Sequence, residues 1–312
     1  MLHTLSIDPN PDLFGPSLVI GLANAGIYSV LAVALVLTFK ISRTVGFMHY
    51  GIAVIGAYGY YHFTAAYRWN GLAALFFLVA IGGVVGGLYG LMVMNRRIAF
   101  LPRLTLSTLS LAFMLLLSSI ATLNFPVRPD VAISASPFGD SSFRILEFNV
   151  TAHRFMSLII TVGLVILLAL WLNGTRAGVN VRAISDDVEA ARWSGIRMFR
   201  IGVGAYAVSG AMSCLAGALL APVAGTDLSA ILLVFFRALT IAVVGAFYSP
   251  ALALLGAVVL SLTETFMTTT AVGDTGPGSR EATIFLMMLA TALLVAKMRK
   301  QLGRRPLEVE VL

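Results

Sequence analysis

Long runs of apolar residues, separated by short polar segments, extend along nearly the whole chain. A helix that crosses a bilayer needs about 20 consecutive, mostly apolar residues. Nine runs approach or reach that length, and each is predicted to form one helix: Leu13–Phe39, Val45–Phe63, Gly71–Met94, Leu104–Leu123, Phe155–Leu172, Ile201–Ala224, Leu228–Phe247, Ala251–Met267 and Ala282–Ala296. The pattern predicts an all-α polytopic membrane protein with about nine transmembrane helices, within a range of eight to ten.

Two of these ranges carry features that interrupt a regular membrane helix. Val45–Phe63 is crowded with glycine and aromatic residues, whereas Leu228–Phe247 contains Arg237 and is followed by Pro250. Irregular backbone at membrane depth is tolerated only where protein or a water-filled path surrounds it. Either range is therefore a candidate for a broken or re-entrant helix.

Composition supports a membrane protein without a separate soluble domain. Of the 312 residues, 59% are hydrophobic and 11% are charged, whereas soluble domains are about 25% charged. No polar block is long enough to fold as an extramembrane module. We therefore expect one transmembrane domain over residues 1–312, with its longest polar loops at 124–153 and 173–200.

The basic residues indicate the orientation of the chain. Of the 21 Lys and Arg residues, 15 fall in loops on one predicted side, five fall on the other, and Arg237 lies within a span. Cytoplasmic loops of membrane proteins carry such an excess of Lys and Arg. The N-terminus and loop 124–153 are therefore expected outside, and the C-terminus and loop 173–200 in the cytoplasm. Loop 124–153 is either a landing surface for an external partner or a plain connector.

The chain shows no set of residues typical of catalysis or metal binding. Cys214 is the single cysteine, and the four histidines lack the spacing of metal ligands. No nucleophile elbow and no phosphate-binding Gly-Lys-Ser/Thr occurs. We expect neither an enzyme nor a cofactor bound by this chain.

Two charged residues lie well inside predicted spans, Arg237 and Glu264. A charge at the bilayer centre costs about 2.5–3.5 kcal/mol on insertion scales, so each needs a partner or water. Because their spans are consecutive, the two side chains are expected to pair. A structural bridge is favoured over a role in transport, and the alternative is that Arg237 lies close to a membrane interface in a broken seventh helix.

A charged, helix-capable segment interrupts the apolar runs between Thr175 and Ile196. Asp186 can cap a helix with Glu189 three residues later, an arrangement resembling a capping box, and acidic residues favour that helix end. Gly195 suits a left-handed C-terminal stop. The segment predicts a helix of about eight residues, or about 12 Å.

Small residues on this helix suggest a contact with another protein. Ala190 and Ala191 leave it slim enough to enter a groove, with Val188 and Trp193 as apolar contacts. The alternative is a surface helix that lies on its own membrane domain. Composition alone favours neither interpretation.

Four stretches resemble segments of the permeases of branched-chain amino-acid type ABC transporters, and they follow one another along the chain in the same order as in that family. The cytoplasmic segment is similar to the coupling segment of that family through Arg182, Ala183, Asp187, Ala191, Gly195 and Ile196. The first span resembles the family through Gly21, Leu22, Ile27, Tyr28, Ala32 and Leu35. The second resembles it through Arg43, Val45, Phe47, His49, Gly56, Ala57 and Tyr58. The late segment does so through Ala238, Gly245, Ser249, Gly256 and Glu264.

The second-span motif also departs from the family pattern. Gly46, Tyr50 and Gly51 stand where the family usually has asparagine, glycine and glutamate. If these positions line the path, it is narrower and less polar in this chain. The resemblance therefore says less about the substrate than about fold and role.

The resemblance implies a permease subunit of an ABC importer in the bacterial inner membrane. Its partners would be a second related permease, two cytoplasmic ATPases that bind ATP and Mg, an external solute-binding protein and membrane lipid, but not nucleic acid. The implied contacts to the ATPases are Arg182, Asp186, Asp187, Ala190, Ala191, Gly195 and Ile196. The implied lining of the translocation path is Asn24, Tyr28, Phe47, His49 and Tyr50.

The substrate stays open at this point. Branched-chain or other hydrophobic amino acids lead, and urea, short amides or small carboxylic acids are alternatives. A lone membrane histidine such as His49 is more often a packing residue than a path residue. An ion-coupled secondary transporter is disfavoured because such proteins usually carry several acids or histidines within spans, whereas here only Glu264 and His49 qualify.

Overall fold

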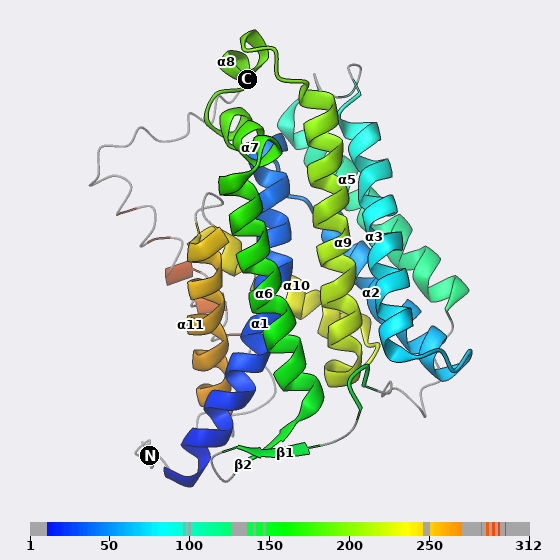
Figure 1. Ribbon diagram of the computed structural model, residues 1–312, viewed down its shortest axis with the longest axis vertical. Helices are drawn as coiled ribbons and strands as arrows, with labels where there is room; N and C mark the ends of the chain where they lie inside the picture. The colour runs from blue at the N-terminus through cyan, green and yellow to red at the C-terminus, as the bar shows by residue number, and fades with distance from the viewer. Residues whose placement is uncertain are drawn as a thin grey trace, which may run out of the picture.

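The computed structural model is a bundle of long helices with a short helical extension at one end (Figure 1). It describes residues 11–95, 98, 101–125, 136–139, 142–145, 148–245 and 250–269, and the single positions 282, 285, 286, 289, 290, 293 and 297. The helices are α1 (Pro11–Ser42), α2 (Met48–Ala65), α3 (Gly71–Val93), α5 (Arg103–Asn124), α6 (Ala152–Gly174), α7 (Arg176–Asp186), α8 (Val188–Trp193), α9 (Met198–Ala224), α10 (Leu228–Val244) and α11 (Pro250–Thr269). Strands β1 (Ser142–Ile145) and β2 (Phe148–Thr151) form an antiparallel hairpin.

Eight of the nine predicted spans coincide with helices, so the all-α polytopic fold is confirmed. Within the described residues, α1, α3, α5, α6 and α9 are long and apolar enough to cross a membrane. Helix α10 and helix α11 are apolar but shorter. The ninth predicted span, Ala282–Ala296, lies mostly outside the described residues.

The two ends of the bundle differ in structure. Helices α7 and α8 extend one end, and the β1–β2 hairpin lies at the other (Figure 1). The hairpin falls within the predicted external loop 124–153, where Phe138 stacks on His153 with ring centroids 5.9 Å apart. His153 in turn hydrogen-bonds the Leu219 carbonyl oxygen of α9, at 3.0 Å. These contacts fasten the described part of the loop to the bundle.

Helix α1 occupies the centre of the bundle, and α3, α5 and α6 lie at its periphery. Buried residues make up 83% of the most apolar window of α1 but only 22% of that of α5. In α6 the buried positions recur every three or four residues and include Ser157 and Thr161, whereas Ile159 and Leu167 are exposed. This is one helical face turned inward. Apolar outer faces are expected for helices surrounded by lipid.

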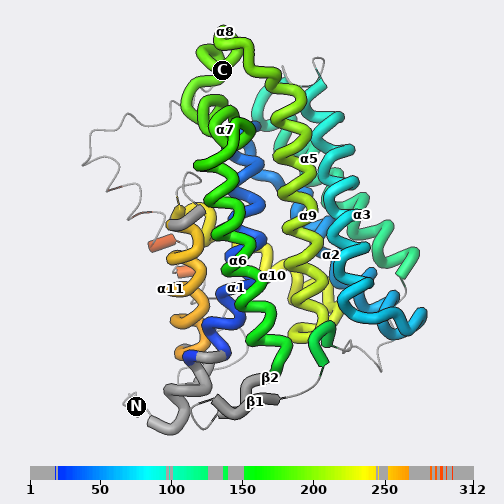
Figure 2. Tube along the Cα trace, viewed as in Figure 1, coloured from blue at the N-terminus to red at the C-terminus, as the bar shows by residue number. Residues whose placement is uncertain are grey.

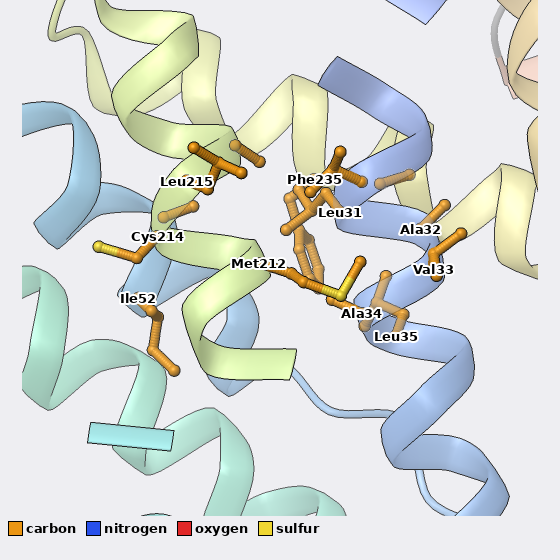
Figure 3. Close-up of a cluster of buried hydrophobic side chains, with 14 of the residues drawn as sticks. Leu31, Ala32, Val33, Ala34, Leu35, Ile52, Met212, Cys214, Leu215 and Phe235 are labelled. Atoms are coloured by element: carbon orange, nitrogen blue, oxygen red, sulfur yellow. The ribbon is translucent and has the colours of Figure 1, made fainter. Parts of the chain in front are cut away.

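Apolar side chains from α1, α2, α9 and α10 meet at the core (Figure 3). Leu31 and Leu35 of α1, Ile52 of α2, Leu215 of α9 and Phe235 of α10 are all buried there. Four segments far apart in the sequence are thereby held together by packing.

Glycines allow α9 to approach α2 and α3 closely, as small residues do between membrane helices. A Cβ atom on Gly86 of α3 would overlap the carbonyl oxygen of Tyr206, and one on Gly217 of α9 would overlap that of Ala53. Both positions therefore require a residue without a side chain.

Helix α10 and helix α11 form a helical hairpin that does not extend to the α8 end of the bundle (Figures 1 and 2). Only residues 225–227 separate α10 from α9, and α11 returns toward the start of α1, where Ser261 donates to the carbonyl oxygen of Gly21 at 2.7 Å. Of the two ranges suspected of irregularity, Leu228–Phe247 therefore has the geometry of a re-entrant helix. The other range forms the uninterrupted helix α2.

Candidate functional site

Helices α7 and α8 project from the bundle through very short connections (Figure 1). Thr175 alone separates α6 from α7, and its hydroxyl oxygen accepts a hydrogen bond from Gly178 N–H at 3.1 Å. A Cβ on Gly178 would overlap backbone atoms of Trp171 and Leu172, so the corner between α6 and α7 requires glycine there. Arg182 braces the same corner by donating to Asn173 Oδ1 at 3.1 Å.

The structure has a short helix before Gly195, but the predicted cap at Asp186 is wrong, because the segment forms two helices, α7 and α8, that break at Asp187. Asp186 is the last residue of α7, and Asp187 is extended, with φ −147° and ψ 112°. The Asp187 carboxylate accepts from the N–H groups of Glu189 and Ala190, at 2.8 and 3.0 Å. Asp187, not Asp186, therefore caps α8.

The predicted stop at Gly195 is confirmed. Gly195 has φ +75°, a left-handed conformation that glycine adopts without strain. Ile196 N–H donates to the Ala191 carbonyl oxygen at 3.2 Å, as in a Schellman motif. Helix α8 is thus a closed, capped unit with a defined entry to α9.

The two alanines of α8 face opposite environments. Ala191 is 3% exposed and packs into the chain itself, so it does not offer the slim outer face that the sequence suggested. Ala190 is exposed, and the neighbouring Trp193 is 88% exposed. Exposed tryptophans near the centre of a patch are frequent anchors of protein interfaces. The outward surface of α8 therefore includes Ala190 and Trp193 as its apolar part, next to the exposed Glu189.

The inner side of α7 packs on the end of α1. Val181 and Ile184 are fully buried, and the guanidinium of Arg43 donates to the carbonyl oxygen of Ser185. Arg43 has φ 56° at the turn that leaves α1. Movement of α7 must therefore act on the central helix of the bundle.

His49 lies at a junction of three helices. Its ring nitrogens are 3.0 Å from the Thr38 hydroxyl of α1 and 2.8 Å from the Ser213 hydroxyl of α9, and the side chain is fully buried. Both polar atoms of the ring are thereby used inside the chain. This arrangement favours packing over lining a path.

Phe47 and Tyr50 contact α10 rather than an open space. Each ring centroid lies 6.1 Å from that of Phe235, and the Tyr50 hydroxyl donates to the Leu228 carbonyl oxygen at 3.2 Å. Of the remaining predicted path residues, Tyr28 is buried and Asn24 is half-buried, both on α1. The predicted path residues thus gather on α1 and around the start of α2.

Arg237 and Glu264 pair as predicted. Arg237 Nη2 and Glu264 Oε1 are 2.7 Å apart, and the two side chains are 9% and 10% exposed. The Arg237 guanidinium also lies over the Tyr28 ring, 5.6 Å from its centroid, a cation–π contact. The bridge joins α10 to α11 and to α1.

The sequence did not predict the partners of His49, Phe47 and Tyr50. Thr38, Ser213 and Phe235 carry no local signal, because a hydroxyl or a phenyl ring in an apolar run is ordinary. Among the described residues, no group of three or more His, Cys, Asp or Glu side chains could hold a metal ion.

Comparison with known proteins places this geometry in a family. Residues 17–297 match the model of the branched-chain amino acid transport system permease component. The high-affinity branched-chain amino acid transport system permease protein LivH of Escherichia coli K12, and that of Salmonella typhimurium, are each 24% identical over 257 residues, covering 78% of this chain and 82% of theirs. The fructose import permease protein FrcC of Rhizobium meliloti is 27% identical over 202 residues, covering 62% of this chain and 52% of its own.

A solved structure shares the fold. PsaBC from Streptococcus pneumoniae, in complex with Fab, superposes with a TM-score of 0.51 at 11% identity, covering 88% of this chain and 89% of the other. The family match covers nearly the whole chain, and its members are transport permeases rather than enzymes. With its membrane-length helices, the protein is a multi-pass membrane protein. The chain belongs to the family of branched-chain amino acid transport system permease components.

Proposed function

We propose that this chain is the translocation subunit of an ATP-driven importer for branched-chain or other hydrophobic amino acids. The whole chain, residues 1–312, would act as one transmembrane domain that pairs with a second, related permease. Two cytoplasmic ATPases would bind ATP and Mg and drive it, and an external solute-binding protein would deliver the substrate. The observation that carries the proposal is the capped helix α8, which presents Ala190 and Trp193 outward at one end of the bundle.

The distribution of basic residues supports a cytoplasmic position for that end. Among the described residues, Arg43, Arg103, Arg176, Arg182, Arg192, Arg197 and Arg200 lie at the α8 end of the bundle. Arg68, Arg144 and Arg154 lie at the hairpin end. This asymmetry follows the positive-inside rule. The N-terminus is then outside, and the C-terminus is cytoplasmic.

The coupling contact follows from α8. Closure of the ATPases around ATP moves α8, and the short junctions at Thr175 and Asp187 pass this motion to α6 and α7. Rigid-body rotation of the permease halves then opens the path alternately to each side. Among the residues implied by the family resemblance, Ala190 contacts the ATPase, Asp187 and Gly195 shape α8, and Arg182 positions α7.

Co-purification of the ATPases tests this contact. Ala190→Trp places a bulky ring on the exposed face, and Trp193→Ala removes the exposed anchor, so each variant should retain at most about one tenth of the bound ATPase. Val179→Trp is the matched control, because Val179 is exposed on α7 and lies outside α8. Ala191→Trp is unsuitable, since Ala191 is buried within the chain. Wild-type amounts of ATPase on both α8 variants would contradict the proposal.

The substrate requires a separate experiment. The LivH relatives favour a branched-chain amino acid, whereas the FrcC relative favours a sugar as the second candidate. Proteoliposomes that contain the permeases and ATPases, supplied with the binding protein, should accumulate labelled leucine in an ATP-dependent manner. Accumulation of fructose without leucine would support the sugar instead, and labelled urea, acetamide and acetate test the remaining alternatives.

A further inference from the structure

A cavity of about 640 Å³ opens at the α8 end of the bundle, between α8 and the ends of four long helices. Its walls come from the last turns of α1 and α3, the first turns of α5 and α9, and Val188 and Arg192 of α8. Among the side chains in these walls, Arg43 has been described above as the donor to the Ser185 carbonyl oxygen. The cavity lies apart from the outward face of α8 that carries Trp193.

The walls of this cavity are strongly basic. Arg43, Arg103 and Arg192 contribute to them, and none of the described residues that line it is acidic. The N-terminal ends of α5 and α9 also border the cavity, and neither receives a side-chain cap. Uncapped helix N-termini present N–H groups and a partial positive charge, which favour an anion.

Apart from Ser42, the rest of the described wall is apolar. Leu101, Leu106 and Phe199 contribute to it, and Leu101 and Phe199 are 39% and 48% exposed. The adjoining face of α5 begins with Leu104, which is 82% exposed, and continues along a helix of membrane-spanning length. A soluble anion would leave this apolar surface uncovered. A molecule with a charged head and hydrocarbon chains would cover both parts.

We propose that this cavity binds the phosphate headgroup of an anionic phospholipid from the leaflet on the α8 side. Basic pockets between membrane helices on the cytoplasmic side are suited to such headgroups. The arginines surround the phosphate, and the acyl chains follow the exposed apolar face of α5 into the bilayer.

The position of the cavity gives the lipid a mechanical role. Val188 and Arg192 belong to α8, and the other walls belong to the membrane bundle, so a bound headgroup ties α8 to four helix ends. ATP-driven transport should therefore be faster in bilayers that contain anionic lipid. This consequence depends on the importer function proposed above, whereas lipid binding itself does not.

Native mass spectrometry of the full chain in a neutral detergent tests the binding directly. Wild-type protein should bind phosphatidylglycerol at least about tenfold more tightly than phosphatidylcholine. Because each arginine near an anionic headgroup contributes about a fivefold change in affinity, the double variant Arg103→Gln/Arg192→Gln should bind phosphatidylglycerol about 30-fold more weakly. The charge-conserving variant Arg103→Lys/Arg192→Lys should stay within about threefold of wild type.

The matched control is Arg197→Gln/Arg200→Gln, which removes two exposed charges at the same end that do not line the cavity. If this control lost as much phosphatidylglycerol binding, the loss would reflect the total positive charge at this end rather than the cavity, and the proposal would be overturned. Inorganic phosphate that binds the wild type with the same dependence on Arg103 and Arg192, without a preference for phosphatidylglycerol, would reject a lipid ligand. ATPase co-purification that falls in the double variant while lipid binding is unchanged would identify a protein contact instead.

Discussion

The buried ion pair between Arg237 and Glu264 allows a quantitative prediction about stability. Glu264→Gln keeps the shape of the side chain and removes its charge, which leaves the Arg237 guanidinium buried at 9% exposure. The ring of Tyr28 then stays as its described partner, and the Nε atom of Arg237 already has no hydrogen-bond partner in the structure. Removing one partner of a buried pair costs about 3–5 kcal/mol. We expect the free energy of unfolding of Glu264→Gln to fall by that amount.

Removing both charges should restore most of the loss. In Arg237→Met/Glu264→Leu, apolar side chains of similar length replace the pair, and such replacements are often neutral or stabilising by about 1–4 kcal/mol. Single and double variants together form a double-mutant cycle, whose coupling energy we expect to exceed about 2 kcal/mol.

The single cysteine of the chain provides the assay. Cys214 lies fully buried in α9, so a thiol-reactive fluorophore labels it only when the bundle opens. Unfolding by heat and by SDS can be followed in this way without engineering a reporter. A coupling energy below about 0.5 kcal/mol would refute the reasoning, because the charges would then be solvated independently. So would a double variant that is less stable than either single variant.

Three further predictions concern packing and capping. Gly217→Ala should destabilise by about 1–3 kcal/mol, because its methyl group would overlap the Ala53 carbonyl oxygen, whereas Gly163→Ala, with open space around its Cβ, should be neutral or stabilising in the same unfolding assay. Tyr50→Gly should cost about 3–5 kcal/mol and leave the relative uptake of different solutes unchanged, since the ring packs inside the chain; altered selectivity at full stability would contradict this. Asp187→Ala should weaken α8 by about 1 kcal/mol and reduce ATPase co-purification, and an equal effect from Asp186→Ala would argue against the observed cap.

Much of the fold follows from local pattern. A membrane helix satisfies its backbone hydrogen bonds internally, so a long apolar run is sufficient to predict it. The C-terminal end of α8 could also be predicted from the sequence, because glycine is the residue type that a left-handed helix stop favours, and Gly195 stands there. The loop 124–153 was harder to interpret, since its strands pair only within four residues on each side.

The break between α7 and α8 at Asp187 could not be predicted from the sequence. Asp186 and Asp187 have the same capping chemistry, and packing of Ile184 and Ser185 on the bundle decides where α7 ends. The same packing turns Ala191 inward and Ala190 outward.

Most contacts between residues far apart in the sequence also could not be predicted. His49 bonds with residues 11 and 164 positions away, so its packing role depends on how α1, α2 and α9 assemble. Periodicity in one segment carries no information about such contacts. The pairing of Arg237 with Glu264 was predictable because the cost of a buried charge requires a partner, and few candidates lie within the spans.

The short connections around α7 and α8 make this part of the protein a stiff lever. One residue joins α6 to α7, one joins α7 to α8, and four, residues 194–197, join α8 to α9. If the linkers were flexible, Trp193 could move without moving the membrane helices. Because the linkers are short, a displacement of Trp193 moves α6 and α9 together. Inserting two or three glycines after Asp187 should therefore uncouple ATP hydrolysis from uptake even where the ATPases still bind.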